Sequence, residues 1–362
     1  MKVAVILGTR PEIIKMSPVI KELENAGIEF FITHTGQHYA YNMDKVFFEQ
    51  LNLHSAKYNL EAGSGSHGEQ TARILSGIEK VLLKEQPDIT LVQGDTNTAL
   101  AGALAASKLG IVVGHIEAGL RSGDRHMPEE INRILADHCS DYLFAPTETS
   151  RSLLTHEGIS PDKIFITGNT IVDALYRNIQ IAESQENPLK LLNLQPHQYF
   201  LVTVHRQENV DYPRRLAPII LALDKIASYY ALPVVYPIHP RSLKRLQDYN
   251  LMPSRLCLTN PLDYFSFLIL EKNARLILTD SGGVQEESCI LGVPCVTLRE
   301  NTERPETLDV GANMLAGTVP ERIYSAVETM LNRKNGWHNP FGDGTASHKI
   351  VNIICRQFTA VA

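Results

Sequence analysis

The chain has 362 residues, of which 44% are hydrophobic and 20% are charged, a length and balance typical of a globular protein with two domains. Its net charge is −6 and its basic residues are scattered, which argues against a nucleic-acid partner. The apolar start at residues 1–7 is too short for a signal peptide or a membrane helix, so we expect a cytoplasmic protein with no membrane partner. The five cysteines are widely spaced, which predicts reduced thiols.

The first half of the chain alternates short apolar runs with helical patterns. This alternation predicts a parallel sheet with helices on both faces, and hence a Rossmann-like domain over residues 1–168. We expect its strands at residues 3–7, 30–34, 89–93, 111–116, 142–145 and 164–167.

Polar side chains follow three of these strands. Arg10 and Lys15 come after the first strand, Asp95 follows residues 89–93, and Glu117 follows residues 111–116. Open parallel sheets bind ligands at the carboxyl ends of their strands, so we expect these side chains at a binding site.

A polar stretch that ends near residue 198 separates the first half from a second alternating pattern. The predicted strands at residues 199–204, 234–238, 256–258, 276–278 and 295–298 form a second Rossmann-like domain over residues 169–345. A last helix within residues 346–362 either stays with this domain or packs back on the first. The predicted fold class is therefore α/β, with two Rossmann-like domains facing each other across a cleft.

The clearest candidate ligand site lies where the strand at residues 276–278 runs into a helix through Ser281, Gly282 and Gly283. Two glycines allow the backbone to approach a ligand closely, and the helix start offers N–H groups and a positive dipole to a phosphate. Glu287 follows in the helix, where a carboxylate can accept the two vicinal hydroxyls of a ribose. The alternative is an ordinary turn with glutamates at a helix start.

Carboxylates of the first half are candidates for acid–base chemistry. Asp95, Glu117 and Glu129 would raise one another's pKa in a partly dry site, so that one is protonated while another is ionised. Each also has a structural interpretation: Asp95 as a helix cap, Glu129 as a helix-start acid, and Glu117 as the partner of Arg121 or Arg133.

The histidines give little support for a metal site. Thirteen are present, without a His-Glu-x-x-His motif or a close His/Cys cluster, so no metal is expected. The first strand lacks a Gly-x-Gly-x-x-Gly fingerprint and no P-loop occurs, so no nicotinamide or ATP cofactor is expected either. His205 and Arg206 follow a strand, where they either donate to a diphosphate or occupy an ordinary loop.

Seven ordered motifs carry a resemblance that spans nearly the whole chain. The sequence resembles the non-hydrolysing UDP-N-acetylglucosamine (UDP-GlcNAc) 2-epimerases. The resemblance implies a glycosyltransferase-B fold and a cytoplasmic homodimer that needs no metal or nicotinamide. It also implies interconversion of UDP-GlcNAc and UDP-ManNAc for surface-polysaccharide synthesis. The motifs are Gly8-Thr-Arg-Pro-Glu12, Gly94-Asp-Thr96, His115-Ile-Glu-Ala-Gly-Leu-Arg121, Pro128-Glu-Glu130, His205-Arg206, Thr279-Asp-Ser-Gly-Gly283 and Thr302-Glu-Arg-Pro-Glu306.

The family's chemistry assigns a role to each candidate residue. It implies anti elimination of UDP to 2-acetamidoglucal and syn re-addition of UDP, with the proton delivered to the other face. By motif, Asp95, Glu117 and Glu129 are the catalytic carboxylates, and which of them removes and which returns the proton stays open. His205 would act at the diphosphate or in proton transfer. The implied binding residues are Arg10, Ser281, Gly282 and Gly283 for phosphate, Glu287 for ribose, Lys15 and Arg304 for the substrate pocket, and Phe267 with the backbone near Leu262 for uracil.

Some bacterial members of the family bind UDP-GlcNAc at a second, activating site. Gln37, His38, Arg73 and His239 occupy the matching positions in this sequence. These residues are either part of such a regulatory site or scaffolding.

Three other functions compete with this hypothesis. A sister epimerase acts on UDP-2,3-diacetamido-glucuronate, but its branch departs from the motif at residues 302–306, which this chain keeps. A glycosyltransferase of the same fold would require an acceptor and would not need three acids. A non-catalytic nucleotide-sugar sensor would bind UDP-GlcNAc unchanged, and the intact set of acids argues against it.

Overall fold

The computed structural model describes residues 1–37, 41–333 and 336–359. By their contacts the residues divide into two compact units, the first Met1–Tyr176 with Phe341–Ala362 and the second Arg177–Pro340. The domain boundaries predicted from the sequence were 168/169 and 345/346. His38, one of the candidate regulatory residues, lies outside the described residues.

The first unit is built on a parallel sheet. In the described part of the chain it has seven strands in the order β3-β2-β1-β4-β5-β6-β7. Chain order reverses beside β1, so β1 and β4 are neighbours whose carboxyl ends form a switch point of the kind where such sheets bind ligands. The strands are β1 (Lys2–Leu7), β2 (Glu29–His34), β3 (Tyr58–Asn59), β4 (Ile89–Gln93), β5 (Val112–Ile116), β6 (Tyr142–Ala145) and β7 (Ile164–Ile166).

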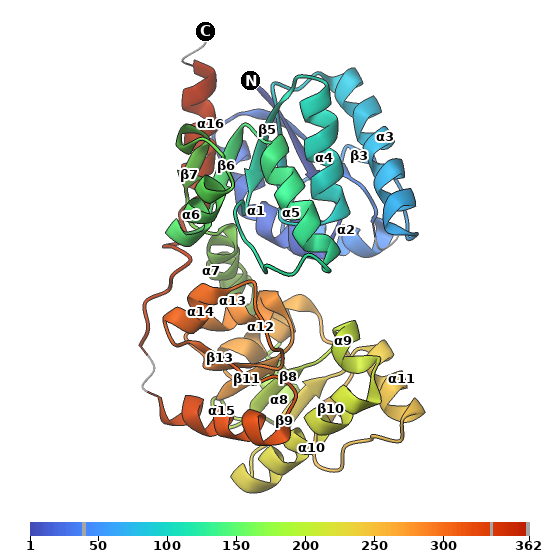
Figure 1. Ribbon diagram of the computed structural model, residues 1–362, viewed down its shortest axis with the longest axis vertical. Helices are drawn as coiled ribbons and strands as arrows, with labels where there is room; N and C mark the ends of the chain where they lie inside the picture. The colour runs from blue at the N-terminus through green and yellow to red at the C-terminus, as the bar shows by residue number, and fades with distance from the viewer. Residues whose placement is uncertain (38–40, 334–335, 360–362) are drawn as a thin grey trace. The chain divides into compact units, whose positions relative to one another are not determined.

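Helices cover this sheet. Figure 1 shows α3, α4 and α5 side by side on it, and the alanine-rich α4 packs closely because Gly102 approaches Val92 and Ile6 of the strands. The last helix, α16, packs on α1, and His348 of α16 lies 2.7 Å from a carboxylate oxygen of Glu22. The helices are α1 (Arg10–Asn25), α2 (Tyr41–Gln50), α3 (His67–Glu85), α4 (Asn97–Lys108), α5 (Pro128–Cys139), α6 (Glu148–His156) and α16 (Ala346–Thr359), with a 3₁₀ turn at Pro161–Lys163. The helix α7 (Thr170–Glu183) begins in this unit and ends in the second.

The second unit is also built on a parallel sheet. Its described residues form six strands in the order β10-β9-β8-β11-β12-β13. Register places Thr203 of β8 beside Thr279 of β11, so the turns that follow these strands start side by side. The strands are β8 (Phe200–Thr203), β9 (Val234–Pro237), β10 (Cys257–Thr259), β11 (Leu276–Thr279), β12 (Cys295–Thr297) and β13 (Asn313–Leu315).

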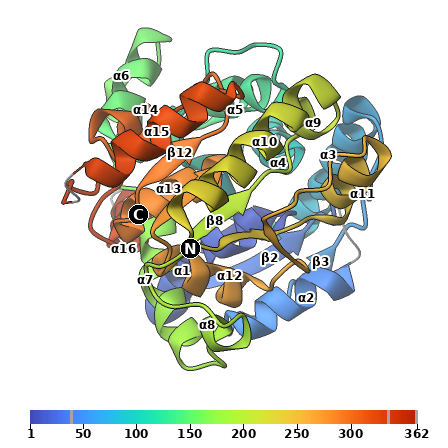
Figure 2. The ribbon, with the colours of Figure 1, turned by 90° about the horizontal axis from the view of Figure 1, so that it is seen from below.

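The core of the second unit is apolar side chains from β8, β9 and β11 packed against α10 and α15, which lie next to each other in Figure 2. This repeated strand–helix alternation confirms the predicted α/β class with two Rossmann-like domains. None of the described helices has both the length and the apolar character that a membrane span requires. The helices are α8 (Pro188–Leu191), α9 (Gln207–Val210), α10 (Pro213–Tyr230), α11 (Pro240–Asp248), α12 (Tyr264–Lys272), α13 (Gly282–Leu291), α14 (Pro305–Asp309) and α15 (Pro320–Asn332).

Candidate active site

Glu117 is held at the end of β5 by donors from three other segments. Lys15 Nζ, on α1, lies 2.7 Å from one carboxylate oxygen of Glu117 and 2.9 Å from the other. Gln93 at the end of β4 also donates to this carboxylate, and Asn169 Nδ2 lies 3.5 Å from it. The Glu117 backbone has φ +70°, a left-handed conformation that is costly for a residue with a side chain. The fold therefore fixes the direction of this carboxylate at the expense of local backbone strain.

Asp95 follows the neighbouring strand and is fixed by α5. Arg133 Nη2 donates to the Asp95 carboxylate, and Asn132 Nδ2 donates to the Asp95 backbone carbonyl at 2.9 Å. Arg133 also lies 3.3 Å from Glu130. Because Arg133 binds Asp95 and Glu130, and Arg121 binds Asp137 and Glu157, the alternative in which Glu117 pairs with Arg121 or Arg133 is wrong.

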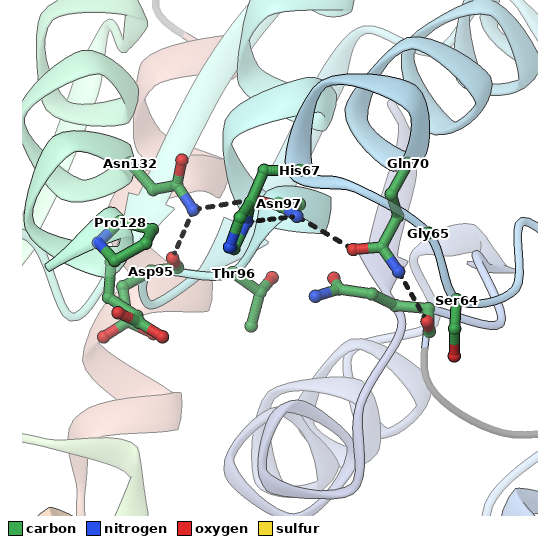
Figure 3. A pocket seen from close by; sticks show the side chains of 11 residues that line it. Ser64, Gly65, His67, Gln70, Asp95, Thr96, Asn97, Pro128 and Asn132 are labelled. Carbon is green, nitrogen blue, oxygen red and sulfur yellow. Dashed lines mark hydrogen bonds between the residues drawn. The ribbon is translucent and has the colours of Figure 1, made fainter. Parts of the chain in front are cut away.

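Asp95 and Glu129 line one pocket of about 240 Å³ in the first unit. In Figure 3, Asp95 and Asn132 stand at one side of it and Gln70 and Ser64 at the other. The pocket wall is polar, because Asn97 Nδ2 donates to Gln70 Oε1 at 2.8 Å and Asn132 Nδ2 donates to Asn97 Oδ1 at 3.1 Å. Its lining residues are Gln37, Ser64, Gly65, His67, Gln70, Asp95, Thr96, Asn97, Pro128, Glu129 and Asn132.

Glu117 is not among the lining residues but lies directly behind the Gly94 turn. A Cβ atom placed on Gly94 would be 3.7 Å from Glu117 Oε2. The structure thus brings Asp95 and Glu129 to one surface and sets Glu117 with Lys15 next to it. Arg10, the first residue of α1, has its guanidinium 5.0 Å from the centre of the Phe47 ring.

Glu12 connects two of the strand-end turns, a role that the sequence analysis missed. Its buried carboxylate accepts hydrogen bonds from Gly8 N at 2.9 Å, Thr9 Oγ1 at 2.8 Å and Thr96 Oγ1 at 2.6 Å. Burial raises the pKa of Glu12 to about 6, although these hydrogen bonds act in the opposite direction. Glu12 therefore ties the turn after β1 to the turn that carries Asp95.

A buried histidine supports the same turns from inside the unit. His115 Nδ1 lies 2.6 Å from Asp137 Oδ1, and His115 Nε2 lies 2.8 Å from the carbonyl oxygen of Gly94. Burial alone would lower the pKa of His115, but the Asp137 carboxylate raises it above its ordinary value. Since both neighbours are acceptors, the ring donates from both nitrogens and holds the Gly94 carbonyl in place.

In the second unit, Asp280 organises the candidate phosphate site. Its buried carboxylate accepts from the backbone N–H groups of His205 at 3.1 Å and Arg206 at 3.0 Å, and from Asn209 Nδ2 at 3.1 Å. His205 Nδ1 lies 3.2 Å from it. Burial raises the pKa of Asp280, but the hydrogen bond and charge of His205 and the other donors bring it below its ordinary value. This role of Asp280 was not predicted from the sequence, although its place at a strand end was a usable signal.

The turn after Asp280 has the expected geometry. Ser281 is the N-cap of α13, and its hydroxyl accepts from Val284 N at 3.5 Å. A Cβ atom on Gly282 would lie 3.4 Å from Glu303 and 3.9 Å from Arg206, and one on Gly283 would lie 3.9 Å from Ser281. A Cβ atom at either glycine would therefore make only ordinary van der Waals contacts, and without one the backbone is accessible at the start of α13, where N–H groups point out of the helix.

A pocket of about 300 Å³ lies beside this turn, with an apolar wall and two histidines. Leu262, Phe267, His205, His239 and Ser281 all line it, so the structure brings these five candidates together. Burial first, and then the charges of His205 and Arg241, lower the pKa of His239. An apolar wall next to a helix N-terminus is suited to a nucleobase joined to phosphates.

Two other candidates of the second unit lie outside this pocket lining. Glu287 is on the second turn of α13. Arg304 is buried, and its Nε donates to Glu286 Oε1, a fully buried carboxylate of the same helix. Arg304, itself part of the loop at residues 302–306, therefore joins this loop to α13. Within the three described segments, no three His, Cys, Asp or Glu side chains are grouped as metal ligands.

Comparison with known proteins identifies the family. A model of the UDP-N-acetylglucosamine 2-epimerases matches residues 21–355. The chain belongs to this family.

Several relatives of this 2-epimerase family member match it over almost their full length. UDP-N-acetylglucosamine 2-epimerase of Methanocaldococcus jannaschii is 57% identical over 361 residues, which covers 98% of this chain and 99% of the relative. The crystal structure of the M. jannaschii enzyme in complex with UDP-GlcNAc and UDP has a TM-score of 0.91 and covers 98% of this chain and 100% of that one. UDP-2,3-diacetamido-2,3-dideoxy-D-glucuronate 2-epimerase of Pseudomonas aeruginosa is 41% identical and covers 98% of this chain and all (100%) of the relative. These matches confirm the predicted family and its glycosyltransferase-B-like fold.

The candidate regulatory residues of this family member are in different settings. Gln37 is buried, and its Oε1 accepts from Thr98 Oγ1 at 2.7 Å. Arg73 is exposed and donates to the Ser64 carbonyl at 2.9 Å. His239 lies in the other unit, at the N-cap of α11. Gln37 and Arg73 thus have structural contacts of their own, and of these two Gln37 lines the pocket of the first unit.

Proposed function

We propose that this protein interconverts UDP-GlcNAc and UDP-ManNAc, an isomerase reaction at C2 of the sugar. The observation that carries the proposal is the match to the M. jannaschii enzyme whose crystal structure contains UDP-GlcNAc and UDP, at 57% identity and a TM-score of 0.91. The P. aeruginosa relative named for the diacetamido-glucuronate sugar is more distant, at 41% identity. We therefore propose UDP-GlcNAc, rather than the diacetamido-glucuronate sugar, as the substrate.

The reaction runs through elimination because the C2 proton has no neighbouring carbonyl to make it acidic. A base removes the proton from C2 while the bond between C1 and the UDP oxygen breaks, which gives 2-acetamidoglucal and UDP. In the return step the UDP oxygen adds to C1 and an acid delivers a proton to the opposite face of C2. The two steps together change only the configuration at C2, so no oxidant or reductant is consumed.

The carboxylates of the first unit supply the base and the acid in this proposal. Asp95 and Glu129 line the same pocket, and Lys15 fixes Glu117 beside it. A positioned carboxylate typically raises the rate of a proton transfer by about 10²–10⁴-fold when it is within reach of the reacting proton. We assign Asp95, Glu117 and Glu129 to this work as a set.

The second unit holds the leaving UDP in this proposal. The N–H groups at Ser281, Gly282 and Gly283 and the side chain of His205 would stabilise the negative charge that develops on the diphosphate. Phe267 with Leu262 would pack on the uracil, since both line the apolar part of the pocket. Glu287 would accept the ribose hydroxyls, and Arg304 and Arg10 would complete the substrate contacts.

Proton NMR of the purified protein with UDP-GlcNAc in D2O tests the proposed reaction. We expect UDP-ManNAc to appear, with deuterium at C2 of both sugars and with no metal or nicotinamide added. The Asp95→Asn variant is the control for a contaminating epimerase. Unchanged UDP-GlcNAc together with turnover of the diacetamido-glucuronate sugar would assign the sister activity instead, and binding of both sugars without turnover would indicate a sensor.

Assembly, location and regulation extend the proposal. We expect a cytoplasmic homodimer, which light scattering of the purified protein and cell fractionation would test. We also expect UDP-GlcNAc to activate the reverse reaction, so that the rate rises sigmoidally with UDP-ManNAc and the sigmoidal shape is lost in Gln37→Ala. A hyperbolic curve in the wild type without added UDP-GlcNAc would contradict this regulation.

A further inference from the structure

Glu271 is an unusual residue in the second unit because its carboxyl group is completely enclosed. It lies near the end of α12 with none (0%) of its surface exposed. Both of its carboxylate oxygens lack a hydrogen-bond donor among the described residues. An ionised carboxylate in such a place is very unfavourable, so the group requires either a cation or a proton.

The neighbour of Glu271 is another carboxyl group. Glu287 of α13, the residue proposed to bind ribose, is within hydrogen-bonding reach of Glu271, and α12 packs directly on α13. Two ionised carboxylates only accept hydrogen bonds, so a hydrogen bond between them requires one proton. Burial is the main reason that the pKa of Glu271 lies well above its ordinary value, and the charge of Glu287 and the hydrogen bond between the two groups act in the same direction.

Among the residues that the structure describes, the other titratable groups that interact with Glu271 do not supply a positive charge. Tyr264 of α12, Tyr199 beside β8 and Cys295 of β12 interact electrostatically with Glu271, and each is neutral or, when ionised, negative. Lys272 follows Glu271 in the chain, but its Nζ donates to Glu183 at 2.5 Å. The α8 helix also packs against α12, and its Lys190 is exposed.

We propose that Glu271 is a protonated carboxylic acid that donates a hydrogen bond to Glu287 and thereby orients the Glu287 carboxylate toward the ribose hydroxyls. The inference rests on the proposed function, in which Glu287 binds the ribose of UDP. Glu271 is buried and does not touch the nucleotide, so it is a positioning residue. Its neutral state lets Glu287 keep the single negative charge of the pair, which makes Glu287 the stronger acceptor for the hydroxyls.

Infrared spectroscopy tests the shared proton without any ligand. We expect the wild type at pH 7 to show the C=O band of a buried protonated carboxyl group, shifted in D2O. The band should be lost in Glu271→Gln and kept in Glu328→Gln, a matched change of an exposed glutamate on α15. A wild-type spectrum without this band would overturn the proposal whatever the protein catalyses.

Calorimetric binding of UDP and 2′-deoxy-UDP tests the orientation of Glu287. We expect 2′-deoxy-UDP to bind the wild type roughly tenfold more weakly than UDP, the scale of one hydrogen bond to a charged group. Glu271→Gln keeps a donor and should keep this ratio. Glu271→Leu has no donor, so the ratio of the Kd for 2′-deoxy-UDP to the Kd for UDP should fall to within about twofold of one. The reference variant Glu287→Gln should lower this ratio in the same way.

The possible outcomes separate the inference from the proposed function. An unchanged ratio in a folded Glu271→Leu variant, or a lost ratio in Glu271→Gln, would overturn the role of Glu271. Thermal unfolding shows which variants fold. If Glu271→Leu does not fold, binding by Glu271→Gln together with the infrared band decides whether Glu271 has the proposed role. If UDP binds no form of the protein, the proposed function fails while the infrared band still decides whether Glu271 is protonated.

Discussion

Lys15 Nζ lies 2.7 Å and 2.9 Å from the two carboxylate oxygens of Glu117, although the residues are 102 positions apart in the chain. The lysine comes from the second turn of α1 and the glutamate from the turn after β5. Both side chains are buried. The pair therefore aligns a catalytic candidate from one strand end with a helix that starts at another.

Replacing Lys15 by Met should remove this alignment. We expect kcat to fall by roughly 100-fold, the scale of a misplaced acid–base group, while the affinity for UDP stays the same because UDP is assigned to the other unit. Turnover by NMR and calorimetric binding measure the two effects. Lys21→Met is the matched control, since Lys21 forms a 2.8 Å pair with Glu24 on the same helix. Full activity in Lys15→Met would show that the pair is only structural.

Isosteric changes of the three carboxylates should separate chemistry from binding. Asp95→Asn, Glu117→Gln and Glu129→Gln should each lower kcat by roughly 10²–10⁴-fold and slow deuterium uptake at C2 to the same extent. UDP should bind each variant as it binds the wild type. Glu148→Gln, on the exposed start of α6, is the control. A variant that keeps deuterium uptake but loses net epimerisation would identify a group that acts on only one face of the sugar.

Replacing Gly282 by Ala should weaken nucleotide binding without weakening the fold. A methyl group there meets no atom closer than 3.4 Å, so the helix accepts it, but it occupies the space that a phosphate needs near the backbone N–H groups. We expect the Kd for UDP to rise about tenfold or more, the effect of losing one hydrogen bond to a charged group. The midpoint of thermal unfolding should stay the same or rise. Gly68→Ala, at the start of α3 with open space around it, should leave the Kd for UDP unchanged, while the midpoint again stays the same or rises.

Glu271→Gln should be more stable than the wild type, by a margin that grows as the pH rises. The pKa of Glu271 is raised in the folded state above the value near 4.5 in the unfolded chain. Below pH 4.5 the carboxyl is protonated in both states, whereas above it the unfolded chain ionises first, so the wild type loses about 1.4 kcal/mol per pH unit until the folded-state pKa is passed.

Urea unfolding of the wild type and Glu271→Gln from pH 4 to pH 8 measures this difference. The free energies of unfolding should agree most closely at the acid end and diverge in favour of the Gln variant as the pH rises. A constant difference over the whole range would mean that Glu271 titrates with an ordinary pKa.

Local sequence patterns determined the two sheets and the places where the candidate residues lie along them. Short apolar runs predicted most strands, because the apolar character of a buried strand is a property of a few neighbouring residues. The strands β3 and β13 were not predicted, since β3 is only the pair Tyr58–Asn59 and β13 begins with the polar Asn313, so neither is a run of apolar residues. The sequence motifs also predicted the family, because motifs keep their order along the chain. They placed Asp95, Glu117 and Ser281 at strand ends.

Only the tertiary structure decided which side chains are partners. The structural alternative for Glu117 paired it with Arg121 or Arg133, which are close in sequence, but the fold brings Lys15 to it instead. The contacts of Asp280 with His205 and of Glu271 with Glu287 likewise join different elements. Charge and hydrogen-bond energies depend on distance and burial in three dimensions, which no local pattern encodes. The sequence therefore located the chemical groups, and the packing of helices on the two sheets set their partners and protonation.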